Sequence, residues 1–151
     1  MAIPRSAIRE SAFIIIFEKS FSDDDLDTIF ENALISLDDD KEIVLNNDVK
    51  ALVSGVYDKS EELDKIIAKF SNKRSFERIP KINLAILRLA LYEANYDDKV
   101  PVNVAISEAV LIAKKYAQKP DVSFINGVLG AYSRNSVIKG EEVKSDKWWV
   151  K

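Results

Sequence analysis

Residues 79–93 read IPKINLAILRLALYE, and this stretch decides the fold of the chain. Within residues 82–92 every position is apolar except Asn83 and Arg88. A helix that is apolar on every side is buried on every side. Pro80 suits the first turn of such a helix, because the N–H that proline lacks has no partner there. We therefore predict a central helix that other helices surround.

The same helical spacing of apolar residues recurs along the rest of the chain. It is found in residues 5–19, 26–37, 49–70, 106–113 and 124–132, with a break expected near residues 59–61. We expect Ser22, Asn47 and Asn103 to cap three of these helices, because short polar side chains bond the first free N–H groups. No alternating run of strand length is present. The prediction is an all-α fold of six to seven helices.

Composition excludes several classes of function. The 151 residues contain neither cysteine nor histidine, so a Cys-His or Ser-His-Asp site cannot form. A chain of this length is expected to form one domain, and cysteine-free proteins fit a reducing compartment. The apolar run 13–17 is too short for a signal peptide or a membrane span. We expect a cytoplasmic protein, and not an enzyme.

The charge is distributed unevenly, although the net value is only −3. Residues 21–48 contain ten acids and one lysine, whereas residues 64–119 contain eleven bases and six acids. Such asymmetry is hidden by the net charge, and a basic region can attract nucleic acid. Solvated helix faces that happen to differ in sign would give the same pattern. The sequence leaves both interpretations open.

Several short motifs resemble those of one known family. They are Leu87-Arg88-Leu89-Ala90, Tyr92-Glu93, Pro101, Glu108-Ala109-Val110, Ala113-Lys114 and Phe124-Ile125-Asn126-Gly127-Val128-Leu129. In their order and spacing, these motifs are similar to the closing helices of the NusB family of bacterial transcription antitermination factors. The resemblance covers roughly a third of the chain well, with a weaker match at the N-terminus.

This resemblance implies a fold and a set of partners. The family fold consists of two three-helix bundles packed at an angle, here about 4–70 and about 79–133 within one domain, 1–133. Family members bind single-stranded boxA-type RNA together with ribosomal protein NusE in an RNA polymerase elongation complex. The resemblance implies no cofactor, metal or membrane, and it leaves a homodimer open. The polar tail 134–151, with Trp148-Trp149, is expected to dock on the domain or on a partner.

The candidate RNA-binding residues come from two regions. Arg5 and Arg9 match arginines at the family's N-terminus. The second region is basic: Lys65, Lys69 and Lys73 recur every four residues, and Arg74 follows them. Phosphate contacts of this kind dominate the affinity of proteins for nucleic acid.

One acidic residue is the candidate contact for a protein partner. In the family, NusE docks near the turn before the last helix, and Asp121 is the acid in that turn. Asp121 could equally be the N-cap of the last helix. The sequence does not decide between these two roles.

Three further residues are expected to serve the structure. Arg88 lies on the apolar central helix, so it requires an acidic partner, for which Glu93 and Glu108 are the candidates. Asn126 and Gly127 lie in the last apolar helix. Glycine costs about 1 kcal/mol against alanine inside a helix, so we expect a closely packed neighbouring helix at Gly127.

A second hypothesis belongs to another class of function. Ser6, Ala7 and Ile8 stand where the family often has further arginines, and Asn83-Leu84 replaces a usual charged pair. These changes reduce the number of expected phosphate contacts. The chain could therefore be a protein-interaction module with the NusB fold that has lost sequence-specific RNA binding.

Overall fold

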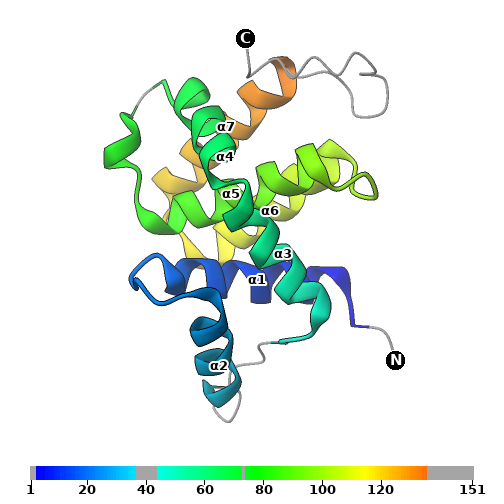
Figure 1. The fold of residues 1–151 in the computed structure, drawn as a ribbon. Helices are drawn as coiled ribbons and strands as arrows, with labels where there is room; N and C mark the ends of the chain where they lie inside the picture. The colour runs from blue at the N-terminus through cyan, green and yellow to red at the C-terminus, as the bar shows by residue number, and fades with distance from the viewer. Residues whose placement is uncertain (1–2, 37–43, 73, 136–151) are drawn as a thin grey trace. The chain divides into compact units, whose positions relative to one another are not determined.

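The computed structural model describes residues 3–36, 44–72 and 74–135, and these residues are predominantly helical (Figure 1). They contain one short 3-10 helix, η1 (Phe76–Arg78), and no strand. The α-helices are α1 (Arg5–Lys19), α2 (Leu26–Ser36), α3 (Asn47–Asp58), α4 (Ser60–Phe70), α5 (Lys81–Tyr96), α6 (Val102–Tyr116) and α7 (Lys119–Asn135). The prediction of an all-α fold with up to seven helices is confirmed.

The chain divides into two compact units between Asp58 and Lys59. The first unit contains α1 to α3, and the second contains α4 to α7. The sequence predicts a first bundle that extends to about residue 70, whereas in the structure α4 contacts α5 and α7. The rings of Phe70 on α4 and Tyr132 on α7 meet edge-on, 6.3 Å between centroids. The apolar face of α4 is therefore completed by the second unit. The break expected near residues 59–61 is confirmed, since α3 ends at Asp58.

In the first unit, α1 contacts both α2 and α3. The inner positions of α1 are almost fully buried, and so is the face of α3 formed by Val49, Leu52, Val53 and Val56. The Tyr57 hydroxyl donates a hydrogen bond to the Ile16 carbonyl at 3.2 Å. Two helices of the same unit thus cover apolar positions of α1.

The caps of α2 and α3 differ from the expected ones. Asp25, not Ser22, caps α2: Asp25 Oδ1 accepts a 2.9 Å hydrogen bond from the Thr28 N–H, which lowers the pKa of this carboxyl. The Ser22 hydroxyl instead accepts the Asp24 N–H. Asn46, not Asn47, caps α3 through the Val49 N–H at 2.9 Å. In each case the residue three positions before the bonded N–H is the cap.

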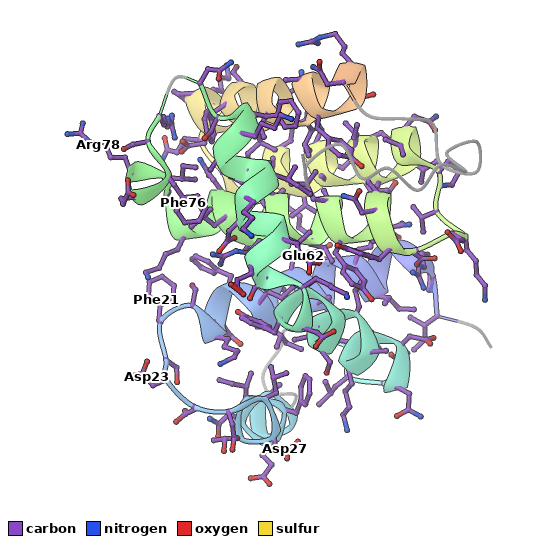
Figure 2. The ribbon with its side chains drawn as sticks, turned by 45° about the horizontal axis from the view of Figure 1, so that its top comes forward. Phe21, Asp23, Asp27, Glu62, Phe76 and Arg78 are labelled. Atoms are coloured by element: carbon purple, nitrogen blue, oxygen red, sulfur yellow. The ribbon has the colours of Figure 1, made fainter. Side chains whose placement is uncertain are left out.

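In the second unit, α5 is the central helix, and it contacts α4, α6 and α7 (Figure 1). Seven of its apolar residues are at most 3% exposed: Ala85, Ile86, Leu87, Leu89, Ala90, Leu91 and Ala94. The predicted central helix is confirmed. Tyr96 is the last residue of α5, and its hydroxyl donates a 2.7 Å hydrogen bond to Glu62 on α4 (Glu62 is labelled in Figure 2). Burial raises the pKa of Tyr96.

The expectations for the starts of α6 and α7 need small corrections. Pro101 occupies the position before α6, and its carbonyl accepts the N–H groups of Val104 and Ala105 at 3.0 Å. Asn103 is therefore already inside the helix and is not its cap. The last helix begins at Lys119, so Asp121, expected in the turn before this helix, lies within it.

The close packing expected at Gly127 is wrong. A Cβ atom built on Gly127 has no heavy atom within 4 Å, and this position is exposed. The buried face of α7 is formed by Ile125, Val128, Leu129 and Tyr132. Gly127 points away from that face into open space, so no helix crossing compensates for its low helix propensity.

Candidate nucleic-acid interface

The second unit brings together one of the predicted RNA-binding residues and the predicted partner residue. Arg74 Nη1 donates a 3.0 Å hydrogen bond to Asp121 Oδ1. Asn83 Nδ2, on α5, donates to the same oxygen at 3.1 Å. The Arg74 guanidinium also lies over the Phe124 ring, 4.4 Å from its centroid. The loop before η1, α5 and α7 thus share one polar cluster, consisting of Arg74, Asn83, Asp121 and Phe124.

Asp121 is not the N-cap of α7. Its own N–H already bonds the Gln118 carbonyl at 2.9 Å, so Asp121 lies inside the first turn of the helix. A carboxylate is stabilised there by the positive end of the helix dipole. The side chains of Arg74 and Asp121 remain 29% and 20% exposed. Asp121 therefore orients the arginine while leaving part of the guanidinium accessible to solvent.

Asn83 is the buried member of the cluster. It is 0% exposed, and its Oδ1 has no hydrogen-bond partner among the described residues. In the described part of the chain, the acceptor for its Nδ2 is Asp121. Since an unsatisfied buried polar group costs about 1–3 kcal/mol, the contact between Asn83 and Asp121 is energetically important.

A groove of about 350 Å³ lies beside the polar cluster. Its wall combines aromatic rings, two arginines and the open position of Gly127: Phe70, Arg74, Phe124, Gly127, Ala131 and Arg134. Phe124 begins the apolar pattern 124–132 of the sequence, and the structure leaves it half-buried in this groove. No local sequence pattern predicts the contact between Phe124 and Arg74, because the two residues are far apart in the sequence. A flat ring beside cations is a surface on which a nucleobase can stack.

The predicted lysines flank this region only in part. Lys65 and Lys69 are exposed on α4, one turn apart, and Lys69 Nζ lies 5.7 Å from the centroid of the Phe70 ring. The helix ends at Phe70, so its repeat of four does not extend further. Lys73 lies outside the described residues. Arg78 of η1 is exposed and points away from the neighbouring helices (Figure 2).

The two N-terminal arginines differ in exposure. Arg5 is exposed at the start of α1. Arg9, one turn later, is only 6% exposed. A guanidinium buried to this degree offers little surface to a phosphate group. Of these two candidates, Arg5 is thus the one that a nucleic acid can reach.

Arg88 has an acidic partner, as expected, but the partner is neither Glu93 nor Glu108. Arg88 Nε and Nη2 donate to the two carboxylate oxygens of Asp64 at 2.7 and 3.1 Å. Asp64 belongs to α4, so this bidentate pair joins α4 to α5. Asn126, the remaining structural candidate, is exposed on α7.

The described residues contain no cluster of three or more acidic, histidine or cysteine residues that could hold a metal ion. No helix among them is long and apolar enough to cross a membrane.

Comparison with known proteins identifies the family. The model of the NusB family matches residues 6–134. The chain belongs to the NusB family.

Curated NusB relatives cover most of the chain. "Transcription antitermination protein NusB" of Acetivibrio thermocellus is 41% identical over 129 residues, which is 83% of this chain and 86% of the relative. The protein of the same name from Thermoanaerobacter sp. strain X514 is 37% identical over 140 residues, 91% and 96% of the two chains. These identities extend across both units, so the family assignment does not depend on the closing helices alone.

Solved NusB structures have the same fold. NusB of T. maritima superposes with a TM-score of 0.78 at 28% identity, covering 92% of this chain and 96% of that one. The NusB chain in a structure of antitermination factors NusB and NusE with dsRNA has a TM-score of 0.73 at 24% identity, covering 87% and 97%. The second likeness concerns the fold alone.

Proposed function

We propose that this chain is a transcription antitermination factor that binds single-stranded, boxA-like RNA together with NusE. Family membership supports the antitermination role, because curated relatives carry that name. The proposed factor acts in the cytoplasm on the RNA polymerase elongation complex, by binding and without a catalytic step. The observation that carries RNA binding is the stacked pair of Arg74 and Phe124 at the edge of the groove.

The groove suits a nucleotide for three reasons. Phe124 offers a ring for base stacking, Arg134 contributes a cation to the wall, and Gly127 leaves the floor open. Base stacking on an aromatic side chain contributes about 1–3 kcal/mol per base and tolerates any sequence. Lys69 of the same unit would add a phosphate contact, and such contacts supply much of the affinity without setting the sequence preference. Arg5, in the first unit, is a separate candidate for a phosphate contact.

Replacement of Phe124 by leucine tests this site. Phe124→Leu keeps an apolar side chain but removes the stacking ring, so we expect RNA affinity to fall about tenfold. The measurement is fluorescence anisotropy with a labelled boxA RNA and a scrambled RNA, each with and without purified NusE. Tyr116→Leu is the matched control, because Tyr116 is another partly exposed aromatic residue with a lysine over its ring. Equal affinities of wild type and Phe124→Leu would rule out the groove as the RNA site.

The alternative function is a protein-interaction module that does not bind RNA specifically. The burial of Arg9 favours it, because one of the two arginines that match the family offers little surface to a phosphate. In that case the wild-type protein would bind NusE but would not distinguish boxA from scrambled RNA. The same titrations therefore separate the two functions.

A further inference from the structure

A second groove, of about 660 Å³, lies between α6 and α7 of the second unit. On the α6 side it is lined by Ile106, Val110 and Leu111. Ile106 and Val110 are one helical turn apart and half-buried, whereas Leu111 is 58% exposed. Unlike the groove at Phe124, the described lining of this α6–α7 groove includes no aromatic ring on which a nucleobase can stack. The groove therefore favours apolar side chains of a protein over RNA.

The charged side chains that line the α6–α7 groove are both basic. Lys114 is exposed on α6, and Arg134 is exposed near the end of α7. Gly130 makes room for the arginine, because a Cβ at this position would lie 3.3 Å from Arg134 Nη1. The lining residues that the structure describes include no carboxylate. An occupant with acidic groups at its edges therefore complements the groove, because opposite charges at the rim of an interface select the partner.

The length and shape of the groove suit an α-helix. Its lining runs along α6 from Asn103 to Lys114, which at 1.5 Å per residue is about 17 Å, or about three helical turns. Because α6 ends at Tyr116 and α7 begins at Lys119, the short connection makes the two helices antiparallel. Lys114 and Arg134, each near the end of its helix, therefore lie at opposite ends of the groove. The described residues contain no strand, so they offer no sheet edge to an extended peptide.

The chain's own segments do not match the groove. Residues 136–151, which include Trp148-Trp149, lie outside the described residues, and with four lysines and three acids they have no acidic excess. The acidic helix α2 already packs its apolar side chains within the first unit, since Ile29, Phe30 and Ala33 are at most 9% exposed. The chemistry of the groove thus calls for a segment of another protein.

We propose that the α6–α7 groove docks an acidic amphipathic helix of a partner protein. The apolar stripe of this helix packs against Ile106, Val110 and Leu111, and its carboxylates pair with Lys114 at one end of the groove and with Arg134 at the other. Amphipathic helices dock in grooves through apolar residues at positions i, i+3 or i+4, and i+7, which a groove of three turns accommodates.

Two synthetic helical peptides test this proposal. Each has about 15 residues, a side-chain staple that holds the helix, which would be marginal in water without it, and leucines at i, i+4 and i+7. One peptide has glutamates at its remaining exposed positions, and the other has lysines. Fluorescence anisotropy with the full chain measures their binding. We expect the glutamate peptide to bind about tenfold more tightly, because two partly exposed ion pairs replace two like-charge contacts.

Variants of the groove show whether the peptide binds there. Leu111→Ser should weaken the binding of the glutamate peptide about tenfold, because an apolar contact is lost. Lys114→Glu should weaken the glutamate peptide and strengthen the lysine peptide, which a loss of folding cannot do. Lys99→Glu is the matched control: Lys99 is exposed in the loop before α6, does not line the groove, and should leave both affinities unchanged. Circular dichroism monitors the fold of each variant.

Four results would overturn the proposal. The first is equal affinity of the two peptides, or no binding of either. The second is an effect of Lys99→Glu as large as that of Lys114→Glu. The third is displacement of the glutamate peptide by purified NusE, which would assign the groove to that protein. The fourth is weaker binding of boxA RNA to Leu111→Ser than to the wild type, which would assign the groove to RNA.

Discussion

At the residue scale, several charged side chains are paired with residues that lie far away in the sequence. Asp121 is shared by Arg74 and Asn83, and Arg88 is paired with Asp64. The sequence indicated that Arg88 needs an acid, because an unpaired guanidinium inside an apolar helix is costly. It could not identify which acid, since that depends on the register between α4 and α5. The role of Asp121 was undecided for the same reason.

Removal of the Asp121 carboxylate should therefore destabilise the protein. Asp121→Ala leaves the buried Asn83 amide without its acceptor, which costs about 1–3 kcal/mol. The measurement is urea denaturation followed by circular dichroism. Asp98→Ala, at an exposed acid, is the control and should change stability by less than about 0.5 kcal/mol.

A second variant at this position, Asp121→Asn, tests the contact with NusE that the sequence predicts. Calorimetric titration of NusE with Asp121→Asn, which keeps an oxygen acceptor but loses the charge, should show weaker, less salt-dependent binding if Asp121 meets a basic partner surface. Wild-type stability of Asp121→Ala would contradict the structural role. Wild-type NusE affinity of Asp121→Asn would contradict the partner role.

At the element scale, sequence patterns predicted the helices more accurately than their ends. Apolar periodicity is repeated over many residues, so one exception does not change the result. A cap depends on one side chain, and adjacent polar residues compete for the role. Around α2, Ser22 and Asp25 both had suitable side chains, and the backbone turn decided in favour of Asp25. The prediction of a closely packed helix at Gly127 is wrong because a glycine in a helix is compatible both with close packing and with open space.

The open position of Gly127 makes a prediction about α7. Gly127→Ala should raise the free energy of unfolding by about 0.5–1 kcal/mol, because alanine has the higher helix propensity and its Cβ meets no atom within 4 Å. Denaturation in urea would measure the gain. Gly130→Ala is the comparison, and its gain should be smaller because its Cβ approaches Arg134 Nη1 to 3.3 Å. If Gly127→Ala instead unfolds more easily than the wild type, a neighbouring helix packs closely at Gly127, as the sequence predicts.

At the scale of the whole molecule, the fold followed from the sequence, but the site followed only in part. The apolar central helix and the family motifs indicated the NusB fold, which depends on patterns that run along most of the chain. The groove at Phe124 is lined by residues from α4, α7 and the loop between α4 and η1. A pattern within one segment of the sequence therefore could not predict the groove. The N-terminal arginines illustrate the same limit, because sequence cannot separate an exposed Arg5 from a buried Arg9.

These two arginines provide the last prediction. Each phosphate contact on single-stranded RNA contributes about 0.7 to the slope of log affinity against log salt. Arg5→Gln should therefore flatten that slope by about 0.7 without changing the melting temperature, because Arg5 is exposed. Arg9→Gln should lower the melting temperature and leave the slope unchanged, because Arg9 is only 6% exposed.

Anisotropy titrations at several salt concentrations, combined with thermal melts, measure both quantities. Lys65→Gln is a useful third variant, since Lys65 is an exposed cation of the second unit. A flatter slope for Arg5→Gln or for Lys65→Gln means that the replaced cation contacts a phosphate. A slope that only Arg9→Gln changes would show that α1 rearranges when RNA binds, because the buried guanidinium must reach solvent to meet a phosphate.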